Sequence, residues 1–329
     1  MSIICFASLK GGVGKTSLSV NVAHAFACRD CRTLVIDLDP TCHASRFFVD
    51  WLDTSSPSPS PSPLAHLFLQ SELPEGEALL ESYTDDPVPL LVVSRDSFDI
   101  LPAGGELRHF LWGQGARTFR ALFPQLLDEL RVHYDHIIID TPPDFNVLTR
   151  NAIAHSDLVV VPVDSSAMSV NCLEEIVESS SHIKRPRWCI VRSLVTKAAS
   201  RIQQLTSERL SENLSLESSE AELLEKAFVD DRDASAEDFL QLLESGSEGS
   251  NSEEDNENEA SERTSPTDSP IYLLNSVVYR SEQQNRLSHL RKTAFDNRET
   301  NKLAEQYLSV ARELESLIER TWTLQEKYA

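Results

Sequence analysis

The sequence lacks any long hydrophobic run. No stretch of its 329 residues approaches the roughly 18–20 consecutive apolar residues that a membrane span needs. Its start, "MSIICFASLK", also lacks a basic leader and a small-residue cleavage site, so we expect a buried strand there rather than a signal peptide. Cysteine is scarce, at six residues without the spacings of a disulfide framework. These absences exclude the membrane and disulfide-stapled classes and predict a cytoplasmic protein.

Positive charge is also in short supply, and the formal net charge is −22. Such a balance normally argues against a nucleic-acid partner. The deficit is concentrated, however, because residues 199–270 hold 20 acidic and 5 basic residues and so carry about −15 of the total. The later stretch "YRSEQQNRLSHLRKTAFDNR" is locally basic. The bulk charge therefore describes one segment and not the whole surface.

Apolar segments alternate along the chain with segments of helical periodicity. The apolar segments are continuous instead of alternating with polar residues, which is typical of parallel strands buried on both faces. We expect strands near residues 3–9, 31–40, 98–105, 134–143, 155–164, 187–196 and 271–279. We expect helices near residues 15–27, 118–132, 169–180 and 299–328. The pattern predicts an α/β fold with a mostly parallel, twisted sheet covered by helices on both faces.

Two stretches interrupt this pattern. Residues 53–63, "DTSSPSPSPSP", are rich in proline and serine and predict an extended loop. Residues 199–270 are dominated by Glu, Asp, Ser and Asn, and we expect an acidic, largely disordered insertion there. The prediction is a single domain made of residues 1–198 and 271–329, with the acidic segment inserted into it.

A glycine loop, "KGGVGKTS", joins the first expected strand to the first expected helix. Gly14, Lys15 and Thr16 match the second half of the P-loop pattern G-x-x-x-x-G-K-[ST]. Leu9 occupies the position of the first glycine, and Lys10 follows it. Glycines let backbone N–H groups surround phosphate oxygens at a helix N-terminus, while the lysine reaches the β- and γ-phosphates and the hydroxyl binds Mg²⁺. The alternative is a glycine turn with two solvated lysines, but the strand before it and the helix after it favour a phosphate site.

The loop resembles the deviant Walker A motif of the ParA/MinD family of ATPases, most closely the Soj-type ParA partition ATPases. The resemblance continues in "VIDLDP" (35–40) and in "YDHIIIDTPPDFNVLTRNAIAHSDLVVVPV" (134–163). Two departures stand at Thr41, where the family commonly has glutamine, and in "DTPPDFN", where a serine often follows the second proline. Both could alter the switch loops without touching the phosphate chemistry.

The resemblance implies ATP and Mg²⁺ as cofactors and a weak intrinsic ATPase activity. It implies that Lys10 crosses a dimer interface to the partner's nucleotide, so that hydrolysis depends on dimerisation. The implied nucleotide-binding residues are Lys10, Gly11, Gly12, Val13, Gly14, Lys15, Thr16 and Ser17.

Three carboxylates, Asp37, Asp39 and Asp140, stand at the ends of expected strands. By resemblance, Asp39 orients the attacking water and is catalytic together with Lys10 and Lys15. Asp37 and Asp140 are implied to lie near Mg²⁺ with Thr16. For each aspartate the alternative is a strand-end carboxylate that caps a helix or faces solvent, and this alternative is strongest for Asp37.

The basic C-terminal stretch supplies candidate DNA contacts, because partition ATPases of this type bind duplex DNA as ATP-bound dimers. The candidates are Arg280, Arg286, Arg291 and Lys292, with Arg298 nearby. Such binding would be directed to phosphates and sensitive to salt. An ordinary solvated helix face explains the same residues equally well. The acidic insertion could oppose DNA binding, a hypothesis motivated only by its charge.

Cys28 and Cys31 form a C-x-x-C pair without a second pair to complete a zinc site. We interpret them as two small, half-buried hydrophobic residues. The histidines at 43, 109, 133, 136 and 155 show no ligand spacing, and no role is assigned to them.

The function favoured is a ParA-like ATPase that forms a homodimer on ATP, binds duplex DNA without sequence preference and is released on hydrolysis. It would segregate plasmid or chromosome DNA with a ParB-like adaptor, and it would be nucleoid-associated when ATP-bound. One alternative is a membrane-associated MinD-type positioning ATPase, although glutamates outnumber the basic residues of the terminal helix, so stable membrane association is not expected. The other is a nucleotide-binding regulatory or scaffold protein with negligible turnover.

Overall fold

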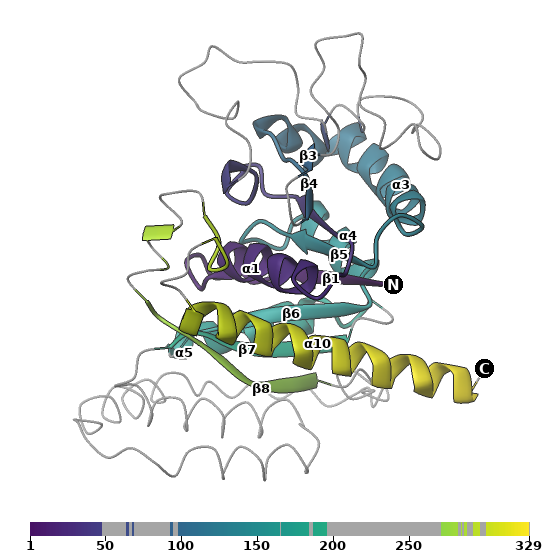
Figure 1. Cartoon of the computed structure of the whole chain (residues 1–329). Helices are drawn as coiled ribbons and strands as arrows, with labels where there is room; N and C mark the ends of the chain where they lie inside the picture. The colour runs from purple at the N-terminus through teal and green to yellow at the C-terminus, as the bar shows by residue number, and fades with distance from the viewer. Residues whose placement is uncertain are drawn as a thin grey trace, which may run out of the picture.

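The computed structural model of the chain is shown in Figure 1. It describes residues 1–47, 64–65, 68, 93–94, 98–164, 166–183, 187–195, 271–281, 284, 286–287, 292–296 and 301–328. The proline- and serine-rich loop 53–63, the acidic segment 199–270 and Arg291 lie outside the described residues. The predicted domain boundaries at 198 and 271 therefore stay predictions.

A single eight-stranded sheet forms the centre of the molecule, with the strand order β3-β4-β2-β5-β1-β6-β7-β8. In this order, every neighbouring pair from β4 through β2, β5, β1, β6 and β7 to β8 is parallel. The edge strand β3 pairs antiparallel with β4. This confirms the predicted fold class. The strands are β1 (Ser2–Phe6), β2 (Thr33–Asp37), β3 (Val93–Ser94), β4 (Asp99–Leu101), β5 (His136–Asp140), β6 (Leu158–Val163), β7 (Arg187–Val195) and β8 (Ile271–Tyr279).

Helices cover both faces of the sheet. They are α1 (Lys15–Ala27), α3 (Gly113–Leu130), α4 (Val147–Ala154), α5 (Ala167–Ser179) and α10 (Asn301–Tyr328), with short 3₁₀ turns η1 (Ser45–Phe47) and η4 (Gly105–Phe110). One hydrophobic cluster packs α3, α4 and α5 against one face, and a second packs α1 and α10 against the other. Figure 1 shows α10 running alongside α1 and β8.

The apolar stripe of α10 is buried, as expected for packing on the domain. Leu303, Tyr307, Val310, Leu314 and Ile318 are each at most 6% exposed and belong to the cluster with α1. Burying a side chain of this size stabilises the fold by about 1.5–3 kcal/mol. Within the described residues, no helix is both long and apolar enough to cross a membrane.

Helix α4 was not predicted from the sequence, although its start carries a readable signal. The Asn146 side chain accepts hydrogen bonds from the backbone N–H groups of Leu148 (2.8 Å) and Thr149 (3.2 Å). These are N–H groups of the first helical turn, which no carbonyl within the helix can satisfy. The cap begins α4 soon after β5, and the helix then packs on the sheet through Leu148, Ala152 and Ile153.

Because the strands are parallel, their carboxyl ends meet at one edge of the sheet. Phe6, Asp37, Asp140, Val163 and Val195 all end strands there. In open α/β sheets, ligands bind outside this edge. The glycine loop after β1 and the aspartates that end β2 and β5 therefore lie at the same edge.

Candidate nucleotide-binding site

The glycine loop connects β1 to α1 through backbone conformations that favour glycine. Gly12 and Gly14 have φ values of +78° and +86°. A Cβ added to Gly14 would lie 2.9 Å from Ser193 Oγ and 3.2 Å from Leu194 Cγ, whereas one added to Gly11 would meet no atom within 4 Å. Gly14 is therefore required both by its backbone angle and by the end of β7, which lies against the loop.

Two side chains from the first turn of α1 converge on one buried carboxylate. Lys15 Nζ donates to Asp140 Oδ1 at 3.2 Å and also to the backbone carbonyl of Thr141, while Thr16 Oγ1 donates to Asp140 Oδ2 at 2.8 Å. Asp140 is fully buried and Lys15 is 7% exposed. A buried carboxylate needs such compensation, because removing a charge from water without a partner is costly.

These residues fit a magnesium nucleotide. An ammonium, a hydroxyl and a carboxylate lie together beside a helix N-terminus whose loop is built around Gly14. Lysine is suited to bind phosphate oxygens, and hydroxyl and carboxylate oxygens are ligands for Mg²⁺. Lys15 would bind the phosphates, and Thr16 and Asp140 would hold the ion. The structure thus brings together three of the residues predicted from the sequence.

The second lysine of the loop is held by residues that sequence reasoning did not select. Lys10 Nζ donates to Asp164 Oδ2 at 2.6 Å, to Ser166 Oγ at 2.6 Å and to Ser169 Oγ at 3.1 Å. These three residues, here called the Lys10 anchor, lie between the end of β6 and the first turn of α5. The only signal in the sequence was an aspartate at the end of an expected buried strand, whereas Asp140 was identified by the family resemblance of the segment around it.

The Lys10 anchor is organised around the carboxylate of Asp164. Ser166 Oγ and Ser169 Oγ donate to Asp164 Oδ1 at 2.6 and 2.5 Å. Burial alone would raise the pKa of Asp164, but hydrogen bonds from Lys10, Ser166 and Ser169 outweigh it and lower the pKa to about 2. The anchor therefore holds Lys10 with a carboxylate that stays ionised at neutral pH.

Asp37 and Asp39 are buried, but their carboxylates bind local groups of their own chain. Asp37 accepts hydrogen bonds from the Ser45 hydroxyl (2.6 Å), the Ser45 N–H (2.8 Å) and the Asp39 N–H (3.0 Å). Asp39 Oδ1 accepts the Thr41 N–H at 2.8 Å. Burial, and secondarily the charge of Asp140, raise the pKa of Asp37 to about 7. In this structure Asp37 is thus bound to the turn at η1, and its role near the metal stays a prediction.

The end of β7 adds an unusual backbone position beside the loop. Leu194 has a φ of +54°, which is uncommon for a residue with a side chain, and Ser193 Oγ is buried without a hydrogen-bond partner. Backbone strain of this kind is often found at functional sites. No sequence signal distinguished these two residues from the rest of a buried strand.

Three of the four predicted DNA-contact residues belong to the described part of the chain, and all three are exposed: Arg280, Arg286 and Lys292. Arg280 follows β8 directly, and its N–H donates to the carbonyl of Val195 at 2.9 Å. It therefore lies at the carboxyl edge of the sheet, the same edge as the glycine loop. The segment that follows contacts α1, since the Ala294 N–H donates to Asn21 Oδ1 at 2.7 Å.

A separate groove of about 680 Å³ lies between α3, α4 and the residues after α5. Its lining includes Trp112, which is 77% exposed, and Arg150, whose guanidinium lies 5.6 Å from the centre of the Phe145 ring. None of its lining residues belongs to the glycine loop. The groove is therefore distinct from the candidate nucleotide site.

Comparison with known proteins agrees with this geometry. A family model described as "AAA domain" matches residues 1–194, more than half of the chain. The chromosome-partitioning ATPase Soj of Thermus thermophilus is 31% identical over 198 residues, which cover 59% of this chain and 68% of the relative. The chain belongs to the ParA/MinD family of ATPases.

A second partition relative covers a similar share of the chain. The chromosome partitioning protein ParA of Myxococcus xanthus is 28% identical over 190 residues, covering 56% of this chain and 59% of the relative. The chain thus spans about six tenths of the length of that relative. Among solved structures, apo McdA of Cyanothece has a TM-score of 0.58 at 16% identity, covering 94% of this chain and 99% of that one. At this level of identity the structural likeness supports the fold.

Proposed function

We propose that this chain is a ParA-type partition ATPase that forms a homodimer on binding ATP, binds duplex DNA without sequence preference and leaves the DNA after hydrolysis. The observation that supports this most directly is the convergence of Lys15 and Thr16 on Asp140, beside a loop that carries the additional lysine Lys10. The partition relatives make segregation of plasmid or chromosome DNA, with a ParB-like adaptor, the favoured task.

The residues of the site divide the work of phosphoryl transfer. Lys15 binds the phosphates of its own nucleotide, and Thr16 and Asp140 provide the oxygen ligands for Mg²⁺. The bound ion supplies positive charge against the negative charge that develops on the phosphate oxygens. Asp39, buried beyond β2, is the candidate to orient the attacking water. Val13, whose side chain is buried, fixes the middle of the loop.

Lys10 couples the reaction to dimerisation in this proposal. Its ammonium is held by the Lys10 anchor in the single chain, so it must leave Asp164 before it can reach a neighbouring subunit's nucleotide. A cation added from a second subunit lowers the barrier by stabilising charge in the transition state. Hydrolysis would therefore be slow in a lone subunit and faster in a dimer.

The position of the basic residues suggests how the bound nucleotide could control the affinity for DNA. Arg280 lies directly after the carboxyl end of β8, and Arg286 and Lys292 lie in the segment that returns to α1. Dimerisation would double the number of such cations on one assembly. Because phosphate contacts release counterions, the affinity should fall steeply with salt.

The test is a gel-shift titration of nonspecific duplex with ATP, ADP or no nucleotide, run together with an ATPase assay. We expect a shift that requires ATP, and hydrolysis that rises when DNA is added and is lost in Lys15→Ala. Replacing both Arg280 and Lys292 with Ala should weaken DNA binding and reduce its salt dependence while leaving ATP binding unchanged.

Three results would separate the competing functions. Hydrolysis without ATP-dependent DNA binding would refute the DNA-binding half of the proposal. ATP-dependent sedimentation with liposomes would instead favour a MinD-type function. Nucleotide binding with no turnover, even with DNA present, would favour a regulatory protein over an ATPase.

A further inference from the structure

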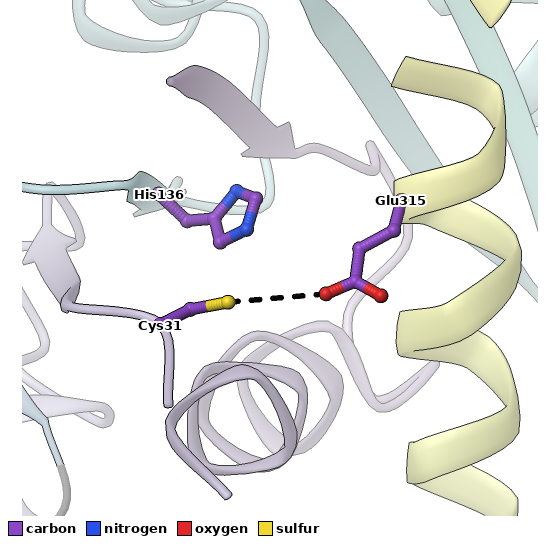
Figure 2. Close-up of side chains that lie close together, drawn as sticks. All are labelled: Cys31, His136 and Glu315. Carbon is purple, nitrogen blue, oxygen red and sulfur yellow. Dashed lines mark hydrogen bonds between the residues drawn. The ribbon is translucent and has the colours of Figure 1, made fainter. Parts of the chain in front are cut away.

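Three side chains with metal-ligating atoms meet at a position that the nucleotide site does not use. They are Cys31, in the turn between α1 and β2, His136, the first residue of β5, and Glu315, on α10. Their ligand atoms all lie within 4.8 Å of one another, and Cys31 Sγ lies 3.9 Å from Glu315 Oε1. Figure 2 shows the three side chains pointing toward one another from these separate elements. Thiolate, imidazole and carboxylate are the ligand types that Zn²⁺ takes in proteins.

The cluster lies at the amino ends of the strands, whereas the nucleotide site lies at their carboxyl ends. Strand β5 begins with His136 and ends with Asp140. Four residues of extended strand separate the two, a distance of about 13 Å. The cluster therefore cannot share an ion with Thr16 and Asp140, and it lies apart from the nucleotide site.

His136 is already oriented as a ligand. Its Nδ1 is hydrogen-bonded to Ser2 Oγ at 2.7 Å, and its ring stacks on Phe26 with centroids 4.2 Å apart. A metal-binding histidine commonly uses its other nitrogen in such a bond, which fixes the tautomer and the ring plane. A neutral imidazole is the form that binds metal. Nε2 is then the nitrogen left for an ion.

An arginine competes for the third ligand. Arg29 Nη2 lies 2.7 Å from Glu315 Oε2, and Arg29 Nε donates to Glu315 Oε1 at 3.1 Å. A metal ion bound through Oε1 would replace the bond from Nε while Oε2 keeps the bond from Nη2. Tetrahedral Zn²⁺ places its ligand atoms about 3.5 Å apart, so the three groups must approach by roughly 1 Å. A small rotation of the Glu315 side chain, which is only partly buried, can supply much of that movement.

The thiol must also lose a proton to bind metal. An ordinary cysteine thiol is protonated at pH 7, whereas a metal ion binds the thiolate. Metal binding would therefore release one proton per ion from this residue.

We propose that Cys31, His136 and Glu315 bind one divalent ion of the Zn²⁺ class, with water as the fourth ligand, and that the ion fastens α10 to the α1–β2 turn and to β5. The three ligands come from parts of the chain 105 and 179 positions apart, so the ion would crosslink distant segments. Its role is structural, since it holds the terminal helix on the face where α1 also packs.

The experiment uses the full chain, reduced and treated with chelator, without nucleotide or magnesium. Titration with Co²⁺ should give one equivalent per chain and a thiolate-to-cobalt charge-transfer band, which Zn²⁺ should then displace. At a free Zn²⁺ concentration 100-fold above the dissociation constant, the unfolding midpoint should rise by about 5–10 °C. Calorimetry in buffers of different ionisation enthalpy should detect the released proton.

Matched variants assign the ligands. Cys31→Ser and Glu315→Gln should each weaken Zn²⁺ binding at least tenfold, and Cys31→Ser should abolish the cobalt band. Cys28→Ser is the control, because Cys28 is exposed and lies outside the cluster. It should change neither the band nor the affinity. Since His136→Gln could disturb folding, its result is interpreted only if its far-ultraviolet circular dichroism matches the wild type; the other two ligand variants test the proposal without it.

Arg29→Ala distinguishes a metal site from a simple ion pair. If the cluster is a metal site, this variant should bind Zn²⁺ more tightly, because Glu315 Oε1 is freed. If the cluster is only an ion pair, the variant should lose stability and show no response to Zn²⁺. The proposal is overturned by absence of a cobalt band, by a band that survives in Cys31→Ser, or by a band that is lost in Cys28→Ser.

Discussion

Replacing Asp164 with asparagine should strengthen ATP-dependent dimerisation. In the single chain, Lys10 Nζ is held by Asp164 Oδ2 at 2.6 Å and by two serine hydroxyls. If Lys10 must reach across a dimer interface, these contacts are lost each time a dimer forms. Asparagine keeps a hydrogen-bond acceptor but removes the negative charge, so Lys10 can leave at a lower cost.

The size of the effect follows from the exposure of the pair. The side chains of Lys10 and Asp164 are 19% and 23% exposed, between a surface ion pair and a buried one. We therefore expect the negative charge of Asp164 to stabilise the bound position of Lys10 by about 1 kcal/mol per subunit. Two subunits release two lysines, so the dimer should be favoured by about 2 kcal/mol, which is about a 30-fold lower dissociation constant.

Sedimentation velocity with a non-hydrolysable ATP analogue measures this constant. Asp128→Asn is the control, because Asp128 is exposed on α3, far from Lys10 in the sequence, and forms an ion pair with the neighbouring Arg131. A folded Asp164→Asn protein that dimerises no better than wild type would refute the idea that the Lys10 anchor opposes dimerisation. If the wild type itself stays monomeric with the analogue, the proposed dimer is refuted instead.

Three further predictions concern stability. The pKa of Asp164 is lowered from 3.8 to about 2 in the folded chain, so its stabilising contribution is complete above pH 4 and is lost as the pH falls toward 2. In urea unfolding, the difference in the free energy of unfolding between wild type and Asp164→Asn should therefore narrow from pH 5 to pH 3. Gly14→Ala should lower the free energy of unfolding by about 1–3 kcal/mol and impair nucleotide binding. Gly11→Ala should stay within about 0.5 kcal/mol of wild type. Thermal unfolding measures the stability of both variants, and a fluorescent-nucleotide titration measures their nucleotide binding. Tyr307→Ala should cost about 3–5 kcal/mol in urea unfolding, because the ring is fully buried in the hydrophobic cluster that contains α1 and α10. Tyr307→Phe should cost only about 1 kcal/mol, for the lost hydrogen bond from Gln284, and equal costs would contradict this assignment.

The elements that could be predicted are those whose signal is local. The helix expected at residues 15–27 has the bounds Lys15–Ala27 in the structure, and the apolar runs before Asp140 and within 155–164 became β5 and β6. A continuous apolar run that is bounded by polar residues and turns has few structural alternatives to a buried parallel strand. The P-loop residues were found for the same reason, because their chemistry lies in consecutive positions.

What could not be predicted depends on distant parts of the chain meeting. Asp164 looks in sequence like any strand-end carboxylate, and only the fold brings it to Lys10, 154 positions away. The sequence predicts that Cys28 and Cys31 are two half-buried hydrophobic residues. This is wrong for Cys28, which is exposed, and incomplete for Cys31, whose thiol faces His136 and Glu315. No ligand spacing links these residues, so no local pattern could reveal the cluster.

The parallel pairing of β7 with β8 sets a minimum length for whatever joins them. Val195 ends β7 at one edge of the sheet and Ile271 begins β8 at the other, so the connection must travel back over nine residues of strand, about 30 Å. Removing residues 208–268 would leave 14 connecting residues, enough to reach about 46 Å when extended. A shortened protein can therefore keep its strand order while losing most of its net negative charge. This makes it a practical starting point for crystallisation and for asking what the acidic segment contributes.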